Sequence, residues 1–155
     1  MERTGDTLGS KKVLVLSEFR FSQILLKPTD MIISITSPGL EHPRPETGDI
    51  PRLNLHFHDV IDEELIGTEL WRTIDPSQAE LIIDFVDDNI EKSECLIVHC
   101  QAGMSRSPGV AIGLSRYYEF SNENELRSQF PHFNITVMKE IHKAWRKKHY
   151  QKSIT

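Results

Sequence analysis

The sequence has few cysteines and no long apolar segment. Two cysteines among 155 residues are too few for a disulfide framework. Cys95 and Cys100 fall within one apparent strand, so their Cα atoms would lie ~16 Å apart, beyond the reach of a disulfide. No apolar run approaches the roughly 20 residues of a membrane helix, and the run at 13–16 is too short for a signal-peptide core. We therefore expect no membrane attachment and a cytoplasmic location.

Positive charge is also in short supply. The chain has 18 lysines and arginines against 23 aspartates and glutamates, a formal net charge of −5. This balance argues against general nucleic-acid binding. Repeats, low-complexity tracts and long linkers are absent, and the length suits one hydrophobic core. We predict a single domain spanning residues 1–155.

Apolar patterning predicts alternating strands and helices. Short β-branched segments at 13–16, 31–35 and 95–98 read as buried strands, and the alternating segment 53–57 reads as a strand with one exposed face. Asp75 to Gln78 has capping-box spacing, which predicts the start of a helix. The helices are predicted at 18–26, from 75 to about 90, and at 107–119, 123–130 and 134–150. Strands separated by helices indicate an α/β fold with a central sheet flanked by helices.

The most informative segment lies between the last predicted strand and its following helix, where ligand sites form in α/β sheets. If the five residues between Cys100 and Arg106 form a loop, their N–H groups and the helix N-terminus can surround a phosphate. Gly103 suits such a loop because it tolerates positive φ. Arg106 offers a planar fork to two phosphate oxygens. The segment reads His99, Cys100, Gln101, Ala102, Gly103, Met104, Ser105, Arg106, Ser107, Pro108.

Cys100 is the candidate nucleophile of this segment. Its sulfur would lie at the base of the loop, in line with a bound phosphorus atom, and the N–H groups and Arg106 would favour the thiolate. Ser107 can donate a hydrogen bond to the sulfur and make it a better leaving group. We expect His99 to support the loop rather than to react, and Cys95 to be a core residue.

The segment from His99 to Pro108 resembles the signature loop of cysteine-dependent protein phosphatases, most closely the dual-specificity subgroup. The resemblance extends over most of the chain, but only the loop matches tightly. It implies a mostly parallel sheet in a three-layer fold, and hydrolysis of phosphotyrosine, with phosphoserine or phosphothreonine as further substrates, on proteins or peptides. It also implies a cysteinyl-phosphate intermediate, no metal or other cofactor, and a phosphate bound by residues 101–106.

The family further uses an aspartic acid on an upstream mobile loop as the general acid. Asp59 occupies that place, after the predicted strand at 53–57. The long connection at 61–74 leaves Asp62 as the alternative. Either carboxyl must come within hydrogen-bond reach of the leaving oxygen.

The same loop is compatible with three other functions: hydrolysis of inositol lipid phosphates, hydrolysis of RNA 5′ phosphates, and phosphate binding without turnover. Related folds act on inositol lipids or RNA 5′ phosphates, but residues 101–105 add no lysine for a multiply phosphorylated head group. RNA binding would depend on the basic residues of the last helix, which we interpret as a solvated face, with an acidic partner as the alternative. A binding module without turnover would lack a general acid, and Asp59 argues against it.

A metal site is the remaining alternative. His56 and His58 stand two positions apart at the end of a predicted strand, as in half of a hydrolase metal site. The sequence offers no third and fourth ligand at suitable spacing. We therefore predict no metal.

Overall fold

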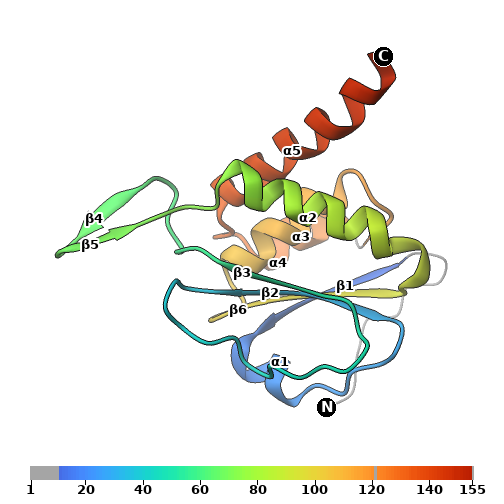
Figure 1. The fold of residues 1–155 in the computed structure, drawn as a ribbon, viewed down its shortest axis with the longest axis horizontal. Coiled ribbons are helices and arrows are strands. Elements are labelled where there is room, and N and C mark those ends of the chain that lie inside the picture. Colours follow the sequence, from blue (N-terminus) through green and yellow to red (C-terminus); the bar gives the residue numbers. More distant parts are fainter. Residues whose placement is uncertain (1–10, 121, 155) are drawn as a thin grey trace.

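The computed structural model describes residues 11–120 and 122–154, which form an α/β fold with helices on both faces of a parallel sheet (Figure 1). The sheet has four strands in the order β1-β6-β2-β3. The strands are β1 (Lys12–Ser17), β2 (Asp30–Thr36), β3 (Arg52–His56), β6 (Cys95–Cys100) and, in a separate antiparallel pair, β4 (Glu64–Ile66) and β5 (Glu69–Trp71). The helices are α1 (Glu18–Gln23), α2 (Pro76–Asn89), the short 3₁₀ helix η1 (Ile90–Lys92), α3 (Arg106–Ser115), α4 (Glu123–Gln129) and α5 (Ile135–Ile154).

Strand β6 lies inside the sheet, as its continuous apolar sequence predicts. It is buried along its whole length and pairs in parallel with β1 on one side and β2 on the other. Val98 is the partner of both Val15 and Ile33. Because the four strands of this sheet are parallel, their carboxyl ends meet at one edge of it. Residues that follow β2, β3 and β6 therefore come together there.

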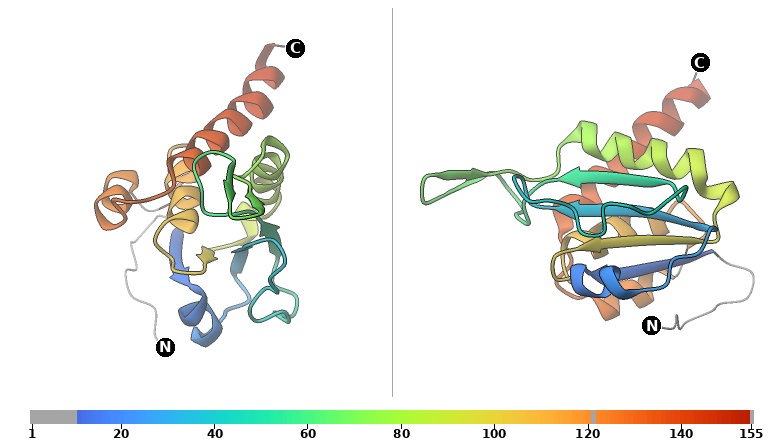
Figure 2. Two further views of the ribbon diagram at one scale, coloured as in Figure 1. Left: turned by 90° about the vertical axis from the view of Figure 1, so that its left-hand side faces the viewer. Right: turned by 60° about the horizontal axis from the view of Figure 1, so that its bottom comes forward.

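The sheet separates two hydrophobic clusters. The larger one packs between the sheet and the helices α2, α3 and α5, and the smaller one packs under α1. Figure 2 shows α1 on the opposite face of the sheet from α2. Neighbouring residues of a strand serve opposite clusters, because side chains alternate along it. Leu96 and Val98 belong to the larger cluster, whereas Ile97 belongs to the smaller one, together with Phe21 and Ile32.

The start of α2 follows the predicted capping box. Asp75 accepts the N–H of Gln78, and the Gln78 side chain accepts the N–H of Asp75, at 2.8 and 3.1 Å. The Ser77 hydroxyl also donates to Asp75 and is the main reason that the pKa of this carboxyl is lowered. Four apolar residues of α2 are fully buried, namely Ala79, Ile82, Ile83 and Val86, whereas Ile90 starts η1 and is half-buried.

Two predicted helices are shorter than expected. The helix predicted at 18–26 ends at Gln23, because the chain becomes extended at Ile24 before Pro28. The helix predicted at 107–119 ends at Ser115, where the N–H of Tyr117 turns back to Leu114. The connection at 61–74, predicted only as a loop, contains the β4–β5 hairpin.

The solvated basic face that the sequence predicts for α5 is present, because Lys139, Lys143, Arg146 and Lys147 are exposed. Lys147 pairs with Glu80 of α2 at 2.6 Å, and Lys148 lies 2.7 and 2.8 Å from Asp84 and Asp87. These ion pairs join α5 to α2 over the larger cluster. Ile135, the first residue of α5, is 43% exposed. No helix in the described part of the chain is long and apolar enough to cross a membrane.

Candidate active site

The loop from Cys100 to Arg106 lies at the carboxyl edge of the sheet, between β6 and α3. Gly103 has φ +68°, and a Cβ atom there would lie 2.5 Å from the backbone nitrogen of Ser17. The Glu18 N–H donates to the Gln101 carbonyl at 3.1 Å. The end of β1 therefore supports the loop from outside, and only glycine fits at position 103.

Cys100 is enclosed at the base of this loop. It is 2% exposed, and its sulfur lies 3.1 Å from the Ser107 hydroxyl oxygen. The Ser107 backbone N–H also donates to the sulfur, at 3.4 Å. Both contacts come from the first turn of α3, where the helix dipole favours negative charge. The sulfur therefore has the backbone N–H and the hydroxyl group of Ser107 beside it.

Arg106 connects the loop to two neighbouring strands. Its Nη1 donates to the carbonyl of Phe57, after β3, at 2.8 Å and to the Ser37 hydroxyl, after β2, at 3.1 Å. The side chain is only 4% exposed, and its Nε has no hydrogen-bond partner among the described residues. The guanidinium is thus fixed in orientation while a buried donor remains available for an anion.

Asp59 faces the same loop from the segment after β3. Its Oδ1 accepts hydrogen bonds from the Ser105 hydroxyl at 2.7 Å and from Asn134 Nδ2 at 3.0 Å. Asp59 lines a pocket of about 150 Å³, whereas Asp62 does not. The pocket is lined by Ser37, Asp59, Trp71, Cys100, Gln101, Ala102, Ser105 and Arg106. Of the predicted loop residues, Gly103 and Met104 do not line it; Gly103 packs against β1 and Met104 is exposed.

Asn134 is a site residue that sequence reasoning missed. It is buried, its Oδ1 accepts the Val137 N–H at 3.1 Å, and its Nδ2 donates to Asp59 and to the Val60 carbonyl. Its backbone N–H donates to Ser105 at 2.9 Å. An asparagine before an apolar helical segment is a recognisable cap. Nothing in the sequence indicates that the same side chain also holds Asp59.

His99 lies beneath the loop in a polar network. Its Nε2 is 2.6 Å from the Ser34 hydroxyl, its ring stacks on Phe21 at 4.3 Å, and burial lowers its pKa to about 3. The Ser34 hydroxyl is also 2.7 Å from His42 Nδ1, and burial lowers the pKa of His42 to about 4. A neutral, fully buried His99 fits the predicted supporting position.

His56 and His58 each have partners of another kind. His56 Nε2 lies 3.1 Å from the Leu40 carbonyl, and His58 Nδ1 accepts the Arg72 N–H at 2.9 Å. Across residues 11–120 and 122–154, no three His, Cys, Asp or Glu side chains form a group that could hold a metal ion. The geometry of these two histidines gives no support to the metal alternative.

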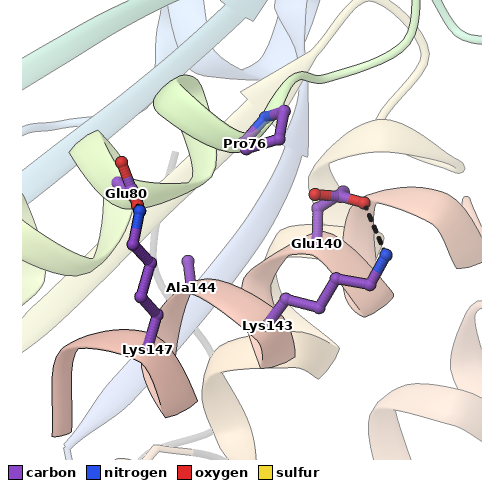
Figure 3. A pocket seen from close by; sticks show the side chains of 6 residues that line it. All are labelled: Pro76, Glu80, Glu140, Lys143, Ala144 and Lys147. Carbon is purple, nitrogen blue, oxygen red and sulfur yellow. Dashed lines mark hydrogen bonds and ion pairs between the residues drawn. The ribbon is translucent and has the colours of Figure 1, made fainter. Parts of the chain in front are cut away.

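A second hollow of about 170 Å³ lies between α2 and α5 (Figure 3). Each of its two lysines is paired with a glutamate, Lys143 with Glu140 and Lys147 with Glu80. The hollow is completed by Pro76 and Ala144 and contains no nucleophile. It offers neither the sulfur nor the loop of backbone N–H groups found at Cys100.

No protein-family model matches the chain, and a search of curated proteins finds no significant match. The chemical argument therefore depends on the arrangement itself. A buried sulfur, a fixed guanidinium and an accessible carboxylate surround one pocket. These groups can supply a nucleophile, an anion-binding fork and a proton donor.

Proposed function

We propose that this protein is a cysteine-dependent phosphatase that hydrolyses phosphate monoesters on phosphorylated proteins or peptides. The observation that carries the proposal is that Cys100 and Arg106, from the loop between β6 and α3, line one pocket with Asp59, from the separate segment after β3. Phosphotyrosine is the expected substrate, with phosphoserine and phosphothreonine as further ones.

The first step forms a cysteinyl-phosphate. The Cys100 thiolate attacks phosphorus, so that the S–P bond forms while the P–O bond to the substrate breaks. Asp59, in its acid form, donates a proton to the leaving oxygen. Arg106 and the loop N–H groups hold the three equatorial oxygens and stabilise their charge.

The second step releases inorganic phosphate. Asp59, now a carboxylate, accepts a proton from water as the water attacks phosphorus, and the S–P bond breaks to return the thiolate to Cys100. The Ser107 hydroxyl, 3.1 Å from the sulfur, donates to the departing thiolate. The two steps balance without a metal or redox cofactor.

The alternative functions fit the pocket less well. Arg106 is the only cation among the residues that line it, whereas a multiply phosphorylated lipid head group favours several. Two of the C-terminal basic residues on which RNA binding would depend, Lys147 and Lys148, are paired with acids of α2. A module that only binds phosphate has no need of Asp59 beside the nucleophile.

Hydrolysis of a small aryl phosphate, with EDTA and a reductant present, tests the proposal. The native protein is expected to turn over, and Cys100→Ser to show no turnover. Asp59→Asn is expected to be slower by about 100-fold or more. Asp62→Asn is the matched control, because Asp62 lies nearby but outside the pocket lining; its rate should stay within about twofold of native.

If the native protein is inactive but still binds phosphate, the proposal of an enzyme fails and the binding-module alternative takes its place. Loss of activity in EDTA, restored by a metal ion, would contradict the cysteine mechanism. A larger effect of Asp62→Asn than of Asp59→Asn would move the general acid to Asp62.

A further inference from the structure

The β4–β5 hairpin extends away from the sheet and helices in Figure 1 and in the right-hand view of Figure 2. Every residue from 61 to 70 is exposed, including the large apolar side chains of Ile61, Leu65, Ile66 and Leu70. A two-stranded hairpin without packing against a core is only marginally stable in water. The hairpin therefore contributes little to the hydrophobic core, and its exposed apolar surface needs another explanation.

The base of the hairpin is fixed at the candidate active site. The His58 N–H donates to the Arg72 carbonyl, and the Arg72 N–H donates to His58 Nδ1, both at 2.9 Å. The Trp71 ring stacks on the buried His58 ring at 4.8 Å. Trp71 also lines the pocket beside Cys100 and Asp59. The hairpin thus begins at the pocket wall.

Strand register assigns the hairpin side chains to two faces. Glu64 pairs with Trp71 and Ile66 pairs with Glu69, whereas Leu65 pairs with Leu70. Because side chains alternate along a strand, the first two pairs share one face and the leucines occupy the other. Glu69 Oε1 lies 3.7 Å from His58 Nε2, which agrees with this assignment. The face that carries Trp71 continues outward with Glu64, Glu69 and Ile66, and we call it the Trp71 face.

We propose that the Trp71 face is the docking surface for the substrate segment next to the phosphorylated residue, and that this segment carries lysine or arginine. The inference rests on the proposed function, because the phosphorylated side chain must enter the pocket beside Trp71. A chain that leaves the pocket along this face meets two exposed carboxylates, Glu64 and Glu69.

Charge complementarity selects the partner. Residues 61–72 contain four acids and one cation, Arg72, whose side chain lies 3.9 Å from Glu63. Basic residues beside the phosphate would pair with the face, whereas acidic ones would be repelled from it. Trp71 adds an aromatic surface on which an arginine or an aryl ring can stack.

Binding to the Cys100→Ser protein tests the inference without requiring turnover. Two phosphotyrosine peptides are compared that differ only in carrying lysines or glutamates at the positions flanking the phosphotyrosine. Each exposed ion pair contributes roughly 1.5- to 5-fold in affinity, so the lysine peptide should bind about 3- to 20-fold more tightly. The difference should shrink at high salt, because salt screens exposed charges.

Two double variants with the same change in net charge test whether the preference for the lysine peptide depends on the Trp71 face. Glu64→Lys with Glu69→Lys should abolish or reverse the preference for the lysine peptide. Asp88→Lys with Glu91→Lys makes the same change in net charge at exposed positions near the opposite end of β6, and should retain the preference. Circular dichroism and thermal unfolding of both proteins establish that they are folded.

Equal binding of the two peptides, or a preference that survives in the Glu64→Lys and Glu69→Lys protein, would overturn the inference. Loss of the preference in the Asp88→Lys and Glu91→Lys protein would also overturn it, since net charge alone would then explain the result. The proposed function fails separately, if the native protein does not hydrolyse the aryl phosphate. Hairpin-dependent peptide binding would then still support docking.

Discussion

The loop at 100–106 and the hairpin at 64–71 border the same pocket but are held in different ways. Cys100 and Arg106 are 2% and 4% exposed and are bonded to α3, to Phe57 and to Ser37. The hairpin is exposed from Glu64 to Leu70 and is fixed at its base by the hydrogen bonds between His58 and Arg72. Cys100 and Arg106, which we propose for catalysis, are thus held in place by the core of the fold. The hairpin residues, which we propose for substrate recognition, can be substituted without disturbing that core.

The largest expected difference between the two regions concerns their arginines. Arg106→Lys removes the fixed guanidinium fork, and kcat/KM for an aryl phosphate should fall by about 100- to 1,000-fold. Arg72→Lys, at the base of the hairpin, leaves the backbone bonds to His58 in place and should change kcat/KM by about twofold or less. Comparable losses in both variants would contradict the separation of the two regions.

Two glycines with the same backbone conformation provide the next comparison. Gly103 and Gly67 have φ of +68° and +64°, so alanine at either position costs about 1–2 kcal/mol. A Cβ at Gly67 meets nothing within 4 Å, whereas one at Gly103 would lie 2.5 Å from Ser17 N. Gly103→Ala should therefore lower the free energy of unfolding by a further ~1–3 kcal/mol, measured with denaturant. Equal losses would mean that the loop is not tightly packed against β1.

The two buried histidines beneath the loop, His99 and His42, should make the free energy of unfolding depend on pH. Burial lowers the pKa of His99 to about 3 and that of His42 to about 4, below their usual 6.5. At a pH between the lowered pKa values and 6.5, the two histidines bind more protons in the unfolded chain than in the folded one. Their contribution to the free energy of unfolding is therefore complete above about pH 6.5 and is lost as the pH falls towards 4. Each such proton corresponds to about 1.4 kcal/mol per pH unit at most.

Denaturant unfolding of the native protein and His42→Gln across pH 4 to 7.5 measures this effect. Relative to the variant, the native protein should lose stability below pH 6.5. Parallel stability curves for the two proteins would show that His42 does not titrate differently in the folded and unfolded states.

Asn134 should act on catalysis by positioning Asp59. Asn134→Ala removes the hydrogen bond to Asp59, and kcat should fall about tenfold, more for aryl phosphates with poor leaving groups, because these depend most on the general acid. Asn122→Ala is the control, since Asn122 also caps a helix, α4, but does not line the pocket. If the two variants lower kcat equally, or if the loss does not depend on the leaving group, Asn134 acts only as a helix cap and does not position Asp59.

The sequence predicts the loop better than it predicts its surroundings. The segment from Cys100 to Arg106 is contiguous, so its residue types and spacing already define its geometry, and the glycine requirement at 103 is visible in it. Trp71 reaches the pocket, and Asn134 reaches Asp59, from distant segments, and that proximity depends on tertiary packing. The acidic loop at 61–74 has no strong strand pattern, and three-residue strands leave little periodicity to detect.

The smallest expected effect belongs to the leucine face of the hairpin. Leu65 is 70% exposed, so Leu65→Ser should change the free energy of unfolding by less than about 0.5 kcal/mol. Leu96→Ala, in the fully buried centre of β6, should cost about 2–5 kcal/mol in the same denaturant titration. Because Leu65 lies opposite the Trp71 face, Leu65→Ser should also retain the preference for lysine-flanked phosphopeptides. Loss of that preference with stability unchanged would assign docking to the leucine face, and charge pairing at Glu64 and Glu69 would no longer explain it.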